Sequence, residues 1–88
     1  MYQIVLKAQA ENFLLKKLDR KTQSRISAKI DALASDPFAS NLNLDKLSGL
    51  DHGYRLRVGN VRIVYEVDTP SKKLIVWKID WRSSVYRP

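Results

Sequence analysis

The sequence predicts an α+β domain in which a helical hairpin packs on one face of a mostly antiparallel sheet of about four strands. Segments with the 3.6-residue period of helices fill residues 8–35, after one short strand-like segment. Three segments with strand character follow in the second half of the chain. Helices and strands that are segregated in this way are typical of α+β folds. The 88 residues fit a single domain, residues 1–88, with one small core.

The first two elements are a strand and a helix. Residues 2–7 are predicted to form the first strand, which can lie beside the last strand and parallel to it. Residues 8–18 contain helix formers, and their apolar positions lie on one side. These positions are Ala10, Phe13, Leu14 and Leu18.

A second helix is predicted after Asp19, whose side chain can cap the first turn. Three apolar residues recur at spacings of four and three and predict one buried stripe: Ile26, Ile30 and Leu33. The helix is expected to end at Asp36, because the residue before Pro37 is pushed out of helical geometry. Residues 38–53 are predicted to be irregular, with leucines that anchor them to the core. These leucines are Leu42, Leu44, Leu47 and Leu50.

A β-hairpin is predicted over residues 54–68, where apolar and polar residues alternate with the period of a half-buried strand. Gly59 and Asn60 suit a two-residue turn. With that turn, Arg57 lies opposite Arg62, and Arg55 falls on the same side. These three arginines are therefore expected on the sheet face opposite the helices, whereas a bulge or longer loop would slip the register.

The last predicted strand follows a turn at Thr69-Pro70-Ser71. Its run over residues 74–79 is apolar on both faces, which is typical of a central strand. Trp77 is therefore expected in the core, although stacking on a nucleic-acid base is the alternative for both tryptophans. For Trp81 the sequence leaves both possibilities open.

Charge and composition limit the classes of function. The formal net charge of +7 favours an anionic partner, which can be RNA, DNA or an acidic protein. The absence of cysteine excludes disulfides and thiolate metal sites. No metal-ligand spacing or phosphate-binding glycine loop is present, so no metal and no cofactor is expected. No apolar run is long enough to span a membrane and no signal peptide is evident, so a cytoplasmic protein is expected.

Three stretches carry a family resemblance: Leu47-Ser48-Gly49-Leu50, the hairpin from Tyr54 to Val67, and a C-terminal Arg82 followed by Val85-Tyr86-Arg87. Together they resemble the RelE/ParE toxin superfamily of type II toxin–antitoxin systems. The resemblance implies a RelE-like fold and, for the RelE-like branch, ribosome-dependent endoribonuclease activity that cuts messenger RNA in the A site. Basic residues of the hairpin and the C-terminus, with a C-terminal tyrosine, line the cleavage site in that branch. The matching positions are Arg55, Arg57, Arg62, Arg82 and Tyr86.

The same residues make chemical sense for RNA cleavage by the 2′-hydroxyl. Arginine stays protonated, so Arg62 and Arg82 are predicted to stabilise the phosphorane, while Arg55 and Arg57 bind RNA. Tyr86 is the best candidate for proton transfer, since nearby positive charge favours its phenolate. Because His52 is the single histidine, a mechanism with two histidines is excluded. A solvated arginine face, and a Tyr86 that covers a sheet edge, are the structural alternatives.

The resemblance also implies partners. These are a cognate antitoxin, the ribosome and messenger RNA, and operator DNA that the complex contacts through the antitoxin. Many relatives have a His-Arg-Arg run where this chain has Trp81-Arg82-Ser83. Two other classes therefore stay open: a ParE-like inhibitor of DNA gyrase, and a non-catalytic RNA-binding or regulatory module.

Overall fold

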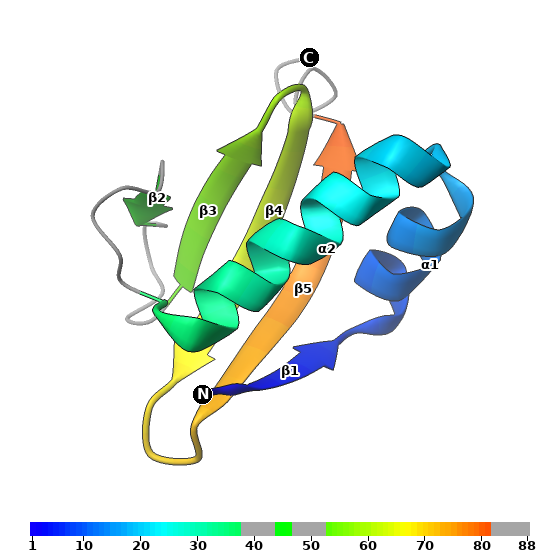
Figure 1. Cartoon of the computed structure of the whole chain (residues 1–88). Coiled ribbons are helices and arrows are strands. Elements are labelled where there is room, and N and C mark those ends of the chain that lie inside the picture. The colour runs from blue at the N-terminus through cyan, green and yellow to red at the C-terminus, as the bar shows by residue number, and fades with distance from the viewer. Residues whose placement is uncertain (38–43, 47–52, 82–88) are drawn as a thin grey trace.

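A computed structural model describes residues 1–37, 44–46 and 53–81 of the chain. In chain order the elements are β1 (Gln3–Leu6), α1 (Ala8–Lys16), α2 (Arg20–Ser35), β2 (Leu44–Lys46), β3 (Gly53–Val58), β4 (Val61–Asp68) and β5 (Lys73–Trp81). Both helices lie on the same side of the sheet, and α2 runs diagonally across it (Figure 1). The predicted α+β architecture is confirmed. We call the sheet face that the helices leave uncovered the open face.

The sheet is mixed, with the strand order β1-β5-β4-β3-β2. β1 is parallel to β5, as expected, and every other neighbouring pair is antiparallel. The sheet has five strands rather than about four, because β2 adds a short edge strand beside β3. The prediction that residues 38–53 are irregular is therefore wrong for Leu44–Lys46, and also for Gly53, where β3 begins. The other three leucines of that segment lie outside the described residues.

The helix boundaries follow local chemistry. Asp19 caps α2, since its Oδ1 accepts a hydrogen bond from the backbone N–H of Thr22 at 2.9 Å. Hydrogen bonds from Thr22 lower the pKa of Asp19. α2 ends at Ser35, and Asp36 has left helical geometry with φ of −151° just before Pro37. α1 ends at Lys16, two residues earlier than predicted.

The core lies between the helices and one face of the sheet. It includes the predicted stripe of α2 and the buried residues of α1, which are Ala10, Phe13 and Leu14. The sheet contributes alternate residues of three strands: Leu56, Val58, Val61, Ile63, Tyr65, Val67, Leu74, Val76 and Ile79. Of the helices in the described residues, neither is long and apolar enough to cross a membrane.

Gln9 anchors α1 to β5 where β1 has ended. The backbone of Ile79 would otherwise present an unpaired edge there, and such groups need partners. The Gln9 side chain accepts from the Ile79 N–H at 3.0 Å and donates to the Ile79 carbonyl at 2.9 Å. One amide side chain thus replaces a strand neighbour at this position.

A β-bulge in β5 changes which side chains reach the open face. The register with β4 shifts between Val64 and Tyr65, so that Trp77 is an extra residue. Val76 and Ile79, three positions apart, are both buried in the core, and Trp77 and Lys78 between them are both exposed. The prediction that Trp77 lies in the core is therefore wrong, and 46% of its surface is exposed. Trp81 instead contacts Phe13 of α1 edge to face, with ring centroids 5.3 Å apart.

Candidate functional site

A tight turn fixes the register of the hairpin. Gly59 has φ of +60°, and Asn60 does not share this left-handed geometry. This pattern fits a type II′ turn, which places glycine at the first central position. The resulting pairs are those predicted, with Val58 opposite Val61 and Arg57 opposite Arg62. The turn therefore decides which face receives the arginines.

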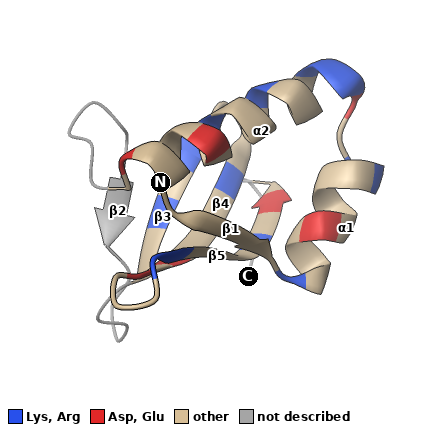
Figure 2. Cartoon of the chain, turned by 60° about the horizontal axis from the view of Figure 1, so that its bottom comes forward, with Lys and Arg blue, Asp and Glu red and all other residues tan. Residues whose placement is uncertain are grey.

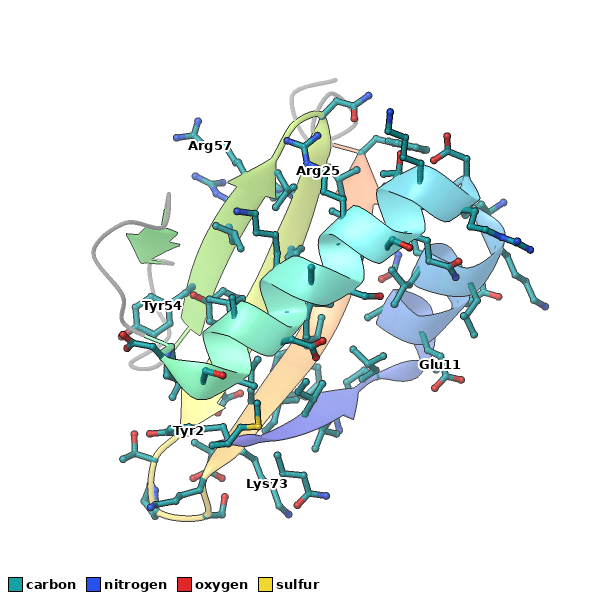
Figure 3. The ribbon with its side chains drawn as sticks, in the orientation of Figure 1. Tyr2, Glu11, Arg25, Tyr54, Arg57 and Lys73 are labelled. Atoms are coloured by element: carbon teal, nitrogen blue, oxygen red, sulfur yellow. The ribbon has the colours of Figure 1, made fainter. Side chains whose placement is uncertain are left out.

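The arginines lie in two adjacent rows of the open face. One row runs from Arg57 on β3 through Arg62 on β4 to Asp80 on β5. The next row aligns Arg55, Val64 and Lys78 across β3, β4 and β5. Arg57 projects outward from the end of β3 (Figure 3). The prediction that the three arginines share the face opposite the helices is confirmed.

Arg62 is the most constrained of these side chains. With 8% of its surface exposed, it is the one buried charged residue among those the structure describes. It lies on β4, the middle strand of the sheet, between Arg57 and Asp80. A buried guanidinium keeps its charge at any physiological pH and loses much of its rotational freedom. Arg62 is therefore a positioned cation, whereas Arg55 and Arg57 are half-buried.

Asp80 offsets the repulsion within this row. Like charges opposite each other destabilise a sheet, so Arg57 and Arg62 carry a cost. Asp80 lies on the other side of Arg62, and its carboxylate is held by the backbone N–H of Trp81 at 2.8 Å. Its Oδ2 also lies 3.6 Å from Nζ of Lys78. The Asp80 carboxylate thus offsets part of the repulsion between Arg57 and Arg62 from the β5 side of the row.

Nothing in the sequence pattern singles out Lys78 as a residue of this face. In an unbroken strand it would alternate into the core, and the bulge at Trp77 is what brings it to the open face. The sequence signal of this bulge is the spacing of three between the two buried residues Val76 and Ile79. It cannot be recognised in advance, because the segment is apolar on both faces.

The C-terminal site residues lie outside the described residues. β5 ends at Trp81, which pairs with Val61, so β5 ends at the end of the sheet that carries Arg57 and Arg62. Arg82, Tyr86 and His52 are not described, and their roles stay predictions. The structure therefore brings together three of the five predicted site residues.

The tyrosines that are described all pack on the helix side of the sheet. Tyr54 and Tyr65 are cross-strand partners with stacked rings, 5.8 Å between centroids. Burial, and then the neighbouring Tyr54, raise the pKa of the Tyr65 hydroxyl, which is buried and makes no hydrogen bond within the described part of the chain. Tyr2 also packs against the core. None of the three faces the arginines.

A second basic surface lies on α2. Lys21, Arg25 and Lys29 are exposed and recur every four residues, so they form one stripe. Arg25 connects this stripe to the hairpin, since its Nη1 would lie 3.4 Å from a Cβ at Gly59. Figure 2 shows basic residues in both layers, on β3 and β4 and along α2.

Comparison with known proteins gives a consistent result. Residues 4–86 match the family model described as the ParE toxin of the type II toxin–antitoxin system parDE. No curated protein sequence matches the chain.

Solved structures match over nearly the whole chain. The archaeal RelE–RelB complex from Pyrococcus horikoshii OT3 contains a chain with 25% identity and a TM-score of 0.80, covering 92% of this chain and 94% of that one. The isolated Escherichia coli RelE toxin matches with 21% identity and a TM-score of 0.78, covering 98% and 92%. The YoeB dimer from Staphylococcus aureus matches with 20% identity and a TM-score of 0.74, covering 91% and 95%. The last two likenesses concern the fold alone.

Proposed function

The chain belongs to the ParE toxin family of type II toxin–antitoxin systems, within the RelE/ParE superfamily, and from this premise we propose that it is a ribosome-dependent endoribonuclease. In this proposal it cleaves messenger RNA in the A site and so inhibits translation. The observation that carries the proposal is the Arg57–Arg62 pair on the open face, with the Arg62 side chain buried. Members of the superfamily that inhibit gyrase lack the ribonuclease residues.

The cleavage step needs charge stabilisation and proton transfer. The 2′-oxygen of one nucleotide attacks the adjacent phosphorus, the bond to the 5′-oxygen breaks, and the phosphorane between them carries extra negative charge. Arg57 and Arg62 can donate hydrogen bonds to its non-bridging oxygens, which is the charge-assisted geometry that arginine favours. Because Arg62 is already ordered, little reorganisation is needed when the charge develops. We assign Arg82 to the same clamp and Arg55 to the neighbouring phosphate.

Tyr86 is the residue that we propose for proton transfer. Of the four tyrosines, the three that the structure describes pack on the helix side of the sheet, away from the arginines. Tyr86 follows β5, which ends at the arginine end of the sheet. This elimination supports Tyr86 among the tyrosines. Histidine is the side chain that usually exchanges protons near neutral pH, and His52 is the single histidine of the chain.

A cognate antitoxin is the expected protein partner. A structure with 25% identity to this chain is a RelE–RelB complex, and so is another, from Methanococcus jannaschii, with the same identity. We propose that an acidic or amphipathic antitoxin segment covers the basic surface. We further propose that the complex meets operator DNA through the antitoxin, and that the toxin works in the cytoplasm, where the ribosomes are.

Inhibition of DNA gyrase is the second candidate, because the matching family model carries the ParE description. The two functions are separated by one pair of assays on purified protein. We expect cuts in ribosome-bound message, located by primer extension in a translation reaction, and no effect on gyrase supercoiling. Arg62→Ala should strongly weaken the cuts. Uncut message together with inhibited supercoiling would establish the gyrase function instead.

A further inference from the structure

The bulge in β5 presents a tryptophan ring on the open face. Val76 and Ile79 stay in the core on either side of it, so Trp77 and Lys78 both point outward. Bulges re-aim side chains and are frequent beside functional sites. Trp77 is the more exposed of the two tryptophans, at 46% against 37% for Trp81, and Trp81 contacts Phe13 on the other face.

Two contacts hold the Trp77 ring in place. Its Nε1 donates a hydrogen bond to Oε1 of Glu66, on the neighbouring strand, at 3.0 Å. Nζ of Lys7, which follows β1, lies 4.7 Å from the ring centroid and makes a cation–π contact. The ring is therefore oriented before anything binds, which reduces the entropy that binding costs.

The position of Trp77 relative to the arginines suits a nucleotide strand. Arg62 pairs with Asp80, three residues along β5 from Trp77. Strand geometry puts the Cα atoms of Trp77 and Asp80 about 10 Å apart, and this spacing corresponds to roughly two or three stacked nucleotides. Lys78 lies between them on the same face.

The cations around the ring suit any anionic partner, and the ring among them is what favours RNA over an acidic peptide. Lys7 and Lys78 flank Trp77, while two carboxylates on this face are engaged: Glu66 holds the indole, and Asp80 accepts from the Trp81 N–H. A cationic track with an aromatic ring is how single-stranded nucleic acid is bound, with phosphates on the cations and a base on the ring.

We propose that single-stranded messenger RNA crosses the open face, with the scissile phosphate at Arg57 and Arg62 and a base stacked on the face of the Trp77 ring that Lys7 does not cover. This inference rests on the proposed ribonuclease function and adds a substrate-positioning residue to it. Trp77 takes no part in proton transfer and does not contact the scissile phosphate.

The test is single-turnover cleavage on programmed ribosomes at a series of protein concentrations. For Trp77→Ala we expect the half-saturating concentration to rise roughly 10- to 100-fold, the range for removal of one stacked base. Trp77→Phe keeps an aromatic face and should restore most of the affinity. Leu15→Ala is the matched control, since Leu15 is an apolar residue of α1 with 60% exposure on the helical layer. All variants should have melting temperatures near that of the wild type.

A second arm tests the base itself. A message with an abasic nucleotide near the cleavage site should weaken wild-type cleavage as much as Trp77→Ala does, and the two changes together should add nothing. Unchanged concentration dependence for Trp77→Ala, with normal cleavage, would overturn the inference and leave the ribonuclease function intact. The inference would also be overturned if Trp77→Ala weakens only the complex with the antitoxin, and the Trp77 ring would then belong to the antitoxin interface.

A fluorescence measurement distinguishes failure of base stacking on Trp77 from failure of the proposed ribonuclease function. In Trp81→Phe, Trp77 is the sole tryptophan and reports directly through its fluorescence. Quenching by a short 2′-O-methyl RNA that disappears with an abasic oligonucleotide would support base stacking even if the wild type cuts no message. Both proposals would be overturned if the wild type cuts no message and Trp81→Phe shows no quenching.

Discussion

Arg62 combines two properties that rarely occur in one surface residue: a permanent charge and near-complete burial. Its neighbours in the row are Arg57, which repels it, and Asp80, which attracts it. Such an arrangement is costly for stability alone, because a buried charge loses its hydration. It is useful when an anion must meet a cation that is already in position.

The first prediction concerns Arg62. Arg62→Ala should slow single-turnover cleavage on saturating ribosomes by about 100- to 1000-fold, as for other positioned electrostatic donors. Arg62→Lys is the matched variant, since it keeps the charge but loses the planar, bidentate geometry, and it should recover only part of the rate. A rate for Arg62→Ala within about tenfold of the wild type would remove Arg62 from the clamp.

The second prediction concerns Tyr86. Tyr86→Phe removes only the hydroxyl, so that folding and ribosome binding should persist while cleavage slows roughly 100- to 10,000-fold. Tyr54→Phe is the control, because Tyr54 stacks on Tyr65 on the helix side and its variant should cleave at the wild-type rate. Wild-type cleavage by Tyr86→Phe would reduce Tyr86 to a packing residue.

At this scale the sequence predicts the arginines well and the tryptophans poorly. Alternation and a two-residue turn are enough to place Arg55, Arg57 and Arg62, since they depend only on local register. The exposure of Trp77 depends on a bulge, which has no sequence signature in a strand that is apolar on both faces.

Among the elements, the β3–β4 hairpin sets the site. Its register follows from the tight turn at Gly59, with φ of +60°, and a slip of one residue would separate Arg57 from Arg62. Helix α2 supports the hairpin from the other side through Arg25, which lies near the turn.

The third prediction concerns this turn. Gly59→Ala forces a side chain into left-handed geometry and should lower the free energy of unfolding by about 1 to 2 kcal/mol, measured by urea denaturation. The space for the added Cβ is ordinary contact with Arg25, so backbone strain is the main cost. Asn60→Ala should change the free energy of unfolding much less, because Asn60 has no positive φ. Equal effects of the two substitutions would contradict the type II′ assignment.

The elements that the sequence missed or misjudged are those that depend on a distant partner. The cap at Asp19 and the stop before Pro37 are local, and both are confirmed. β2 has three residues and no pattern of its own, so only its pairing with β3 identifies it as a strand. Leu18 is placed in α1 by its apolar spacing, but it packs on the core from beyond the helix end.

For the molecule as a whole, charge is distributed over both layers. The net charge of +7 includes the open face and the α2 stripe of Lys21, Arg25 and Lys29. In the proposed function, ribosomal RNA would meet the helical layer and messenger RNA would meet the sheet. Binding and cleavage then respond differently to salt, because only the encounter depends on many phosphates.

The fourth prediction follows from this division. The logarithm of the affinity for ribosomes should fall linearly with the logarithm of the salt concentration. The double variant Lys21→Ala/Lys29→Ala should make this slope less steep, by about 0.7 to 0.9 for each phosphate that is no longer neutralised. The cleavage rate at saturation should not change. Lys73→Ala is the control. Lys73 is exposed and begins β5, at the end of the strand away from the arginines, so its variant should affect the slope less. A slope that the double variant leaves unchanged would exclude the α2 stripe from the ribosome interface.

The parallel pairing of β1 with β5 has a consequence for how the chain folds. Gln3 pairs with Lys73 and Leu6 with Val76, so β1 joins the sheet only through residues from the far end of the sequence. The loop closed by this pairing is almost the whole described chain, and such long-range pairing slows folding. The helices can form early, but β1 and the Gln9 anchor have no place until β5 arrives. The sheet on both sides of β4 is therefore complete only after β5 has been synthesised, and β5 is also the strand that brings Asp80 beside Arg62.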